Sequence, residues 1–193
     1  GILSGFMEDA GRSNGLYFDR KGNLLDCADM ENQLWSINTQ GNQTVSISDF
    51  DGSKLNGPTD LWEHPSGKLY FTDPLYPRDY WNRSPEMQQP GEYVYYFDPK
   101  TNVTTCVATN LKKPNGIIGS PYGKRLYIAD IGDGKTYSYS IEANGSLSNR
   151  QLAVPIGSDG MTMDEHGNIY LTGKGATVFN PQSEQIAHIH VYA

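Results

Sequence analysis

The chain has 193 residues, of which 37% are hydrophobic, so it is long enough to form one well-buried domain. Its formal net charge of −7 argues against a nucleic-acid-binding surface, which would be basic. No run is apolar for long enough to cross a bilayer, and 13 Tyr, 21 Gly and 11 Pro indicate short strands and tight turns rather than helices.

Residues 1–13 resemble the end of an earlier element, and a regular pattern begins at Asn14. From there a two-strand unit with a Gly turn in its middle occurs four times. Its opening residues, separated by 45, 56 and 44 positions, are Asn14, Thr59, Asn115 and Asp159. Four strand-like runs per repeat predict an all-β fold, a β-propeller with about four blades present. We expect one incomplete propeller domain over residues 1–193, with blades at about 14–50, 56–110, 114–156 and 158–191.

The second repeat is the longest because 11 extra residues separate its second and third strands. The resulting loop, residues 74–90, is rich in aromatic residues and proline. Its residues Tyr76, Tyr80 and Trp81 are candidates to roof the channel mouth, although aromatic residues in such loops also serve as packing.

Cys27 and Cys106 lie in strand-like runs of different repeats, which predicts buried free thiols rather than a disulfide framework. No signal peptide is recognised, but the chain begins with Gly1 rather than Met. The compartment is therefore left open; a soluble, cytoplasmic protein is favoured.

The innermost strands of a propeller all begin at the same end of its channel, so the four repeat-opening residues should form a ring around one mouth. Asn and Asp oxygens are hard ligands suited to Ca²⁺ or Mg²⁺. Each Asn-Gly or Asp-Gly alone is an ordinary turn dipeptide. Because an oxygen donor occupies this position in every repeat, we predict a metal or ligand site at the mouth.

Other polar residues are expected to be structural. His188 and His190 alternate on the last strand, which favours a structural role. Asp73 and Asp130 end equivalent strands and should satisfy backbone donors in the turns that follow. The sequence has no Gly-x-Ser-x-Gly elbow and no Walker-type loop.

Several segments together resemble the gluconolactonase/senescence-marker-protein (regucalcin)/luciferin-regenerating-enzyme family, in order and over nearly the whole chain. They are Leu55-Asn-Gly-Pro-Thr-Asp60, Leu69-Tyr-Phe-Thr-Asp-Pro74, Pro114-Asn-Gly-Ile117, Leu126-Tyr-Ile-Ala-Asp130 and Ser158-Asp-Gly-Met161. The resemblance implies a six-bladed parent propeller that holds one divalent cation at the channel mouth and hydrolyses lactones. Ca²⁺ is the expected ion, with Zn²⁺ or Mn²⁺ as alternatives.

The resemblance also implies roles for individual residues. The Asn and Asp of the family's second and third metal-ligand motifs map onto Asn115 and Asp159. The Asn near substrate maps onto Asn56, and its neighbouring Arg is replaced by Lys54, which keeps the charge but loses the fork of donors. We therefore expect Lys54 and Asn56 to bind substrate, and Asp159 to act as general base on a metal-activated water.

Two departures bear on this reading. The family's first-blade Glu motif and its last blade have no counterpart here, and Glu8 lacks the expected context, so the resemblance predicts a longer parent or a repurposed propeller. The leading hypothesis is a metal-dependent lactonase acting on a small-molecule lactone. The alternatives are a non-catalytic propeller that binds Ca²⁺ or a small ligand, a protein-interaction propeller and an inactive fragment. Bare edge strands would also call for a partner, such as a second copy of the chain.

Overall fold

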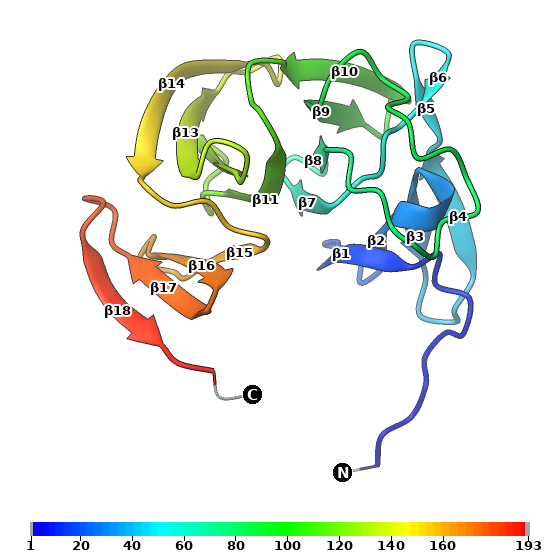
Figure 1. Cartoon of the computed structure of the whole chain (residues 1–193), viewed down its shortest axis with the longest axis horizontal. Coiled ribbons are helices and arrows are strands. Elements are labelled where there is room, and N and C mark those ends of the chain that lie inside the picture. Colours follow the sequence, from blue (N-terminus) through cyan, green and yellow to red (C-terminus); the bar gives the residue numbers. More distant parts are fainter. Residues whose placement is uncertain (1, 192–193) are drawn as a thin grey trace.

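The computed structural model describes residues 2–191, in which four antiparallel sheets of four strands follow one another around an arc (Figure 1). This arrangement confirms the prediction of an all-β propeller with about four blades. Among the described residues, one three-residue 3₁₀ helix, η1 (Asp29–Glu31), is the only helical element. The description of residues 1–193 as one domain, and a partner at the edge strands, stay predictions.

Each blade is a meander whose strands pair in chain order. The first contains β1 (Ser13–Phe18), β2 (Leu24–Ala28), β3 (Gln33–Ile37) and β4 (Gln43–Ile47). The second contains β7 (Asp60–Glu63), β8 (Leu69–Asp73), β9 (Tyr93–Asp98) and β10 (Val103–Ala108). The third contains β11 (Pro114–Gly119), β12 (Arg125–Asp130), β13 (Lys135–Ile141) and β14 (Leu147–Val154). The fourth contains β15 (Met161–Met163), β16 (Ile169–Gly173), β17 (Gly175–Phe179) and β18 (Gln185–Ile189).

The turns use side-chain acceptors together with glycines. Asp19 and Asp164 each accept backbone N–H bonds from the residues two and four positions later, which closes the turn. Gly22 and Gly167, with φ of +84° and +81°, supply the left-handed conformation that these turns need. The turn signals in the sequence therefore mark real strand boundaries.

Most of the hydrophobic core lies between neighbouring blades, and one smaller cluster, with Ala28, Trp35 and Ile37, lies within the first blade. Leu25 of the first blade packs with Leu61 and Phe71 of the second. Trp62 and Tyr70 of the second blade pack with residues of the third blade, including Ile117. Each such side chain contributes roughly 1.5–3 kcal/mol when it is fully buried, so the blade-to-blade contacts hold the arc and fix where the inner strands begin.

Two elements were not predicted. A short hairpin, β5 (Asp49–Phe50) with β6 (Ser53–Lys54), links the first two blades. Its strands are too short to show any hydrophobic period, but Phe50 anchors it, with its ring centroid 4.9 Å from that of Tyr95. The other element is η1, which ends at Asn32 in the left-handed region.

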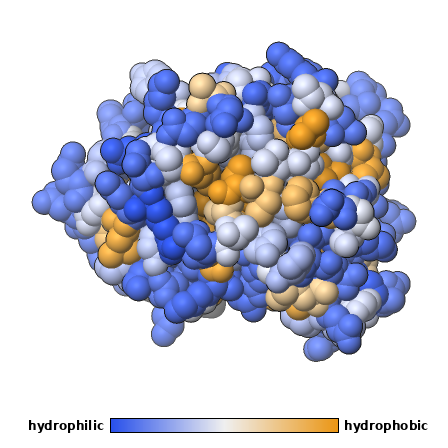
Figure 2. Space-filling model, turned by 90° about the horizontal axis from the view of Figure 1, so that it is seen from above, coloured by the Kyte–Doolittle hydropathy of each residue, from blue (hydrophilic) through white to orange (hydrophobic). Residues whose placement is uncertain are grey.

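The surface and the thiols agree with the composition. Hydrophilic residues cover most of the face seen from above, with apolar residues gathered across its middle (Figure 2). Cys27 is buried and Cys106 half-buried, and both are free, as predicted. Burial raises the pKa of each thiol. Within residues 2–191, no helix has the length and apolar character needed to traverse a membrane.

Candidate functional site

Two of the four Asn-Gly pairs in the sequence, at Asn14 and Asn115, occupy equivalent irregularities at the start of inner strands. The pairing of β1 with β2 shifts between Ser13 and Leu16, and that of β11 with β12 shifts between Pro114 and Ile117. Such a bulge adds one residue to a strand and changes the direction in which a side chain at the bulge points. The repeated Asn-Gly thus marks a real structural device, in which Asn14 and Asn115 hold the same place.

Glycine is required at these bulges because the next inner strand approaches closely. A Cβ on Gly15 would lie 2.6 Å from the carbonyl oxygen of Thr59, and one on Gly116 would lie 3.1 Å from Cγ of Met161. In agreement, β7 lies against both β1 and β11, and β11 lies against β15. The repeat-opening residues are therefore brought to one end of the arc's inner side.

At this end, Asn115 and Asp159 are in direct contact. The Nδ2 atom of Asn115 donates a hydrogen bond of 2.8 Å to Oδ1 of Asp159, and it lies 3.3 Å from the hydroxyl oxygen of Tyr76. Asn115 is 4% exposed, whereas Asp159 is open to solvent. The sequence therefore pairs correctly two residues that lie 44 positions apart.

The side-chain oxygen of Asn115 remains available. Within residues 2–191, no group donates a hydrogen bond to this oxygen. It is also not one of the buried polar atoms in this range that lack a partner, so it must be accessible to solvent. The two other repeat-opening residues have different surroundings. Asn14 is exposed, while Thr59 is buried and its hydroxyl lies 3.0 Å from that of Thr72. Thr72 in turn donates to the backbone oxygen of Asn115 at 2.7 Å, which ties the second blade to the site.

Asn56 has a different environment from the one expected. It is fully buried, and its Nδ2 donates to the backbone oxygens of Asp73 and Gly91, each at 3.0 Å. Its Oδ1 accepts the N–H groups of Gln88 and Gln89 at 2.8 and 3.0 Å. No hydrogen-bonding position is left for a substrate, so these contacts favour a role in fixing the loop between β8 and β9.

Lys54 is also removed from the pair. It is exposed on β6, and the β5–β6 hairpin stands at the outer margin of the arc, away from the inner strands (Figure 1). The substrate-binding roles of Lys54 and Asn56 stay predictions, and the positions of both residues count against them.

Asp73 and Asp130 satisfy backbone donors, but only Asp130 does so in the turn that follows its strand, through the N–H of Asp133. Asp73 accepts the N–H groups of Asn56 and Gly57 at 2.9 and 2.8 Å. Asp130 does the same for Lys112 and Lys113 at 2.8 and 2.9 Å. The donors belong chiefly to the segments that precede an inner strand, so both carboxyl groups position the chain as it enters the mouth.

A further acid, Asp60, lies close to the site and was not singled out from the sequence. Its two carboxyl oxygens accept the N–H groups of Ile117 and Leu61, each at 2.9 Å. Burial raises the pKa of Asp60 to about 7, the two N–H bonds lower it, and the negative charge of Asp159 raises it. The one feature of the sequence that could have identified Asp60 is its position directly after Thr59, one of the four repeat-opening residues.

This raised pKa leads to a stability prediction. The folded protein holds the Asp60 proton more tightly than the unfolded chain does, so this contribution is complete below pH 3.8 and is lost as the pH rises to about 7. Relative to an Asp60→Asn variant, the unfolding free energy of the natural protein should fall over this window by up to about 1.4 kcal/mol per pH unit. Urea denaturation at fixed ionic strength measures it. A difference between the two proteins that does not vary with pH would contradict the prediction.

The loop between β8 and β9 crosses to the first blade, where Asp29 holds it (Figure 1). Asp29, on η1, accepts hydrogen bonds from Tyr80 Oη, Trp81 Nε1 and Arg83 Nη2 at 3.0, 2.9 and 3.3 Å. The guanidinium of Arg83 also stacks 3.3 Å from the Trp81 ring centroid. Tyr80 and Trp81 thus anchor the loop, and of the three predicted roof residues only Tyr76 contacts a predicted site residue.

Asn115 and Asp159 are suited to serve as two of the ligands of a hard cation. Asn115 and Asp159 offer an amide oxygen and a carboxylate side by side, which is the chemistry that Ca²⁺ prefers. Across residues 2–191, no group of three or more His, Cys, Asp or Glu side chains is placed to hold a metal ion. A cation at this mouth would therefore take these two residues together with water or other donors.

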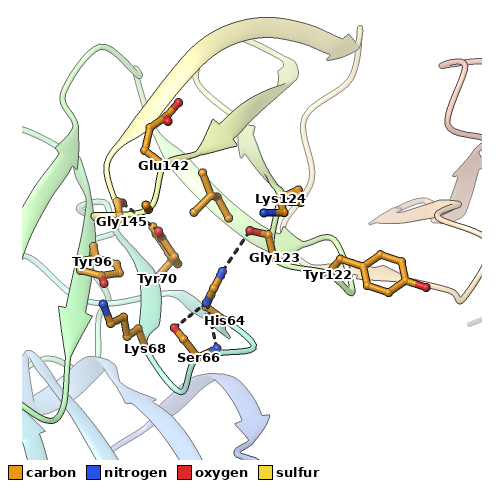
Figure 3. Close-up of a pocket in the computed structure, with 12 residues that line it drawn as sticks. His64, Ser66, Lys68, Tyr70, Tyr96, Tyr122, Gly123, Lys124, Glu142 and Gly145 are labelled. Carbon is orange, nitrogen blue, oxygen red and sulfur yellow. Dashed lines mark hydrogen bonds between the residues drawn. The ribbon is translucent and has the colours of Figure 1, made fainter.

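A separate pocket of about 250 Å³ lies at the far ends of the strands and contains none of the predicted site residues (Figure 3). His64 links two blades there, because its Nδ1 accepts the N–H of Ser66 and its Nε2 lies 3.1 Å from the backbone oxygen of Gly123. Tyr70 donates to the backbone oxygen of Gly145 at 2.9 Å. His64 and Tyr70 thus join the second and third blades at this pocket.

Comparison with known proteins identifies the family of this chain and several relatives. The family model for the SMP-30/gluconolactonase/LRE-like region matches residues 4–193. The gluconolactonase of Zymomonas mobilis is 27% identical over 159 residues, which cover 74% of this chain and 44% of that protein. The lactonohydrolase oryL of Aspergillus oryzae is 25% identical over 177 residues, which cover 77% of this chain and 40% of that protein. The chain thus spans less than half the length of these two curated relatives.

Solved structures agree on the fold. A protein solved as a candidate gluconolactonase superposes with a TM-score of 0.90 at 28% identity, covering 99% of this chain and 68% of that one. The gluconolactonase of Xanthomonas campestris superposes with a TM-score of 0.85 at 24% identity, covering 92% of this chain and 62% of that one. Regucalcin of Agrobacterium tumefaciens, described as a calcium-binding protein, superposes with a TM-score of 0.61 at 18% identity, covering 93% of this chain and 74% of that one. At these lower identities the last two support the propeller alone.

Proposed function

Because the chain belongs to the SMP-30/gluconolactonase/LRE-like family, we propose that it provides part of the active site of a cation-dependent hydrolase that opens sugar-type lactones. The observation that carries the proposal is the contact between Asn115 and the solvent-open Asp159 at the mouth formed by the inner strands. The relatives described as gluconolactonase and lactonohydrolase support the choice of substrate class.

Asp159 is the proposed general base. Its carboxylate is open to solvent, and the hydrogen bond from Asn115 fixes its orientation. It would remove a proton from water as the water oxygen adds to the lactone carbonyl carbon. The ring C–O bond then breaks, and the proton passes to the departing alkoxide, which gives the open hydroxy acid. Asn115 cannot take part in proton transfer, because an amide is too weakly basic.

A divalent cation bound by Asn115 and Asp159 would supply positive charge to stabilise the oxygen that becomes negative during this reaction. Tyr76 adds a hydroxyl group within 3.3 Å of Asn115 Nδ2, where it can hydrogen-bond to substrate. Ca²⁺ is the expected ion, with Zn²⁺ and Mn²⁺ as alternatives.

Ring opening of D-glucono-1,5-lactone, followed by acid release in a pH-stat, tests the proposal. We expect turnover above the uncatalysed rate, its loss on chelation, and its return with one of Ca²⁺, Zn²⁺ or Mn²⁺. Cation binding without turnover of any sugar lactone would favour a non-catalytic binding propeller. If the protein neither binds a cation nor opens a sugar lactone, a protein-interaction propeller would be favoured.

A further inference from the structure

Two cationic side chains flank Tyr76 beside the Asn115–Asp159 pair. The Nζ atom of Lys113 lies 4.5 Å from the centroid of the Tyr76 ring, and the guanidinium carbon of Arg78 lies 5.5 Å from it. The hydroxyl oxygen of the same tyrosine is 3.3 Å from Asn115 Nδ2. A continuous path of contacts therefore leads from Asp159 through Asn115 and Tyr76 to the two cations.

Neither cation is well neutralised. Arg78 forms no ion pair with any residue in the described range 2–191. Lys113 has one carboxylate partner, Glu92, with 4.0 Å between Nζ and Oε1, whereas the neighbouring Lys112 approaches Asp133 to 2.6 Å.

Their surroundings indicate what they would bind. The side chain of Lys113 is 33% exposed, so its ammonium group can reach a ligand at the mouth, and Arg78 is open to solvent. A guanidinium binds carboxylate or phosphate through paired N–H donors, and an ammonium adds a point charge. A neutral sugar lactone carries no charge for these two groups to neutralise.

We propose that Lys113, Arg78 and the Tyr76 hydroxyl form an acid-binding subsite that selects lactones carrying a second acidic group, either a carboxylate or a phosphate. This inference rests on the proposed lactonase function and names the substrate class of that site. The subsite also keeps the substrate's negative charge away from the carboxylate of Asp159.

Binding of open-chain acids tests the subsite without requiring turnover. The probes are gluconate, glucarate and 6-phosphogluconate, which carry at the sixth carbon a hydroxyl, a carboxylate and a phosphate, respectively. Calorimetry at low salt should give a dissociation constant about tenfold lower, or better, for at least one of the two doubly acidic probes than for gluconate. The preferred probe then distinguishes carboxylate from phosphate.

Lys113→Met should remove this preference, and Lys113→Arg should retain it, since the charge is kept. Lys124→Met, at the pocket on the far ends of the strands, is the matched control and should change nothing (Figure 3). Equal affinities for all three acids, no binding of any, or a preference that survives in Lys113→Met would overturn the inference.

These outcomes are distinguishable from failure of the proposed function. If gluconolactone is opened but no acid preference depends on Lys113, the subsite is wrong and the lactonase stands. If the acids bind with the expected preference but no lactone is opened, the subsite stands and the lactonase is wrong.

Discussion

Replacing Asp159 by Asn should lower the rate of lactone opening by about 100-fold or more, because a positioned general base contributes roughly 10²–10⁴-fold. The substitution keeps the size of the side chain and its acceptor oxygen for Asn115, which donates at 2.8 Å in the natural protein. The protein should therefore fold normally while losing the carboxylate. The initial rate of acid release from D-glucono-1,5-lactone measures the effect.

Glu165→Gln is the matched control, because Glu165 belongs to the same blade and its side chain is 88% exposed. We expect full activity in that variant. An Asp159→Asn protein with the natural unfolding midpoint and natural turnover would remove Asp159 from the mechanism, and with it the proposed site.

The second large effect concerns the attachment of the loop between β8 and β9. Asp29→Ala should lower the free energy of unfolding by about 3 kcal/mol or more, since removing one partner of a buried ion pair leaves the other charge uncompensated. The side chains of Arg83 and Asp29 are 11% and 4% exposed, and burial already lowers the pKa of Arg83. Urea denaturation gives the magnitude, and limited proteolysis should show faster cleavage within residues 74–90.

A double variant separates charge from packing. Asp29→Ala with Arg83→Met should recover part of the lost stability, because the uncompensated buried charge is then absent. If the two substitutions are simply additive, the Asp29–Arg83 pair is not what holds the loop. The consequence would reach the site, because Tyr76 belongs to this loop and contacts Asn115.

Features that repeat were predictable from the sequence. Four units with similar strands and turns gave the blades, and the shared position of Asn115 and Asp159 predicted their contact, because a propeller brings equivalent positions together. That Asp73 and Asp130 bind backbone donors followed in the same way from the ends of equivalent strands, but most of those donors precede an inner strand instead of lying in the turns that follow. Periodicity carries this information because each blade buries the same faces.

Features that depend on one contact between distant segments were not predictable. Nothing near Asp29 indicates that it binds Tyr80, Trp81 and Arg83, more than 50 positions later. The saturation of the Asn56 amide likewise arises from backbone groups 17 to 35 positions away. A motif places a residue type at a position, but it does not show whether the hydrogen-bonding capacity of the side chain is already used.

Calorimetric titration of the chelated protein with Ca²⁺, repeated with Zn²⁺ and Mn²⁺, tests the central claim most directly. The account predicts one saturable site for at least one of these ions, with affinity lost or greatly reduced in Asp159→Asn and unchanged in Glu165→Gln. Binding that is equally tight in Asp159→Asn, or no binding of any of the three ions to the natural protein, would contradict a cation site at Asn115 and Asp159.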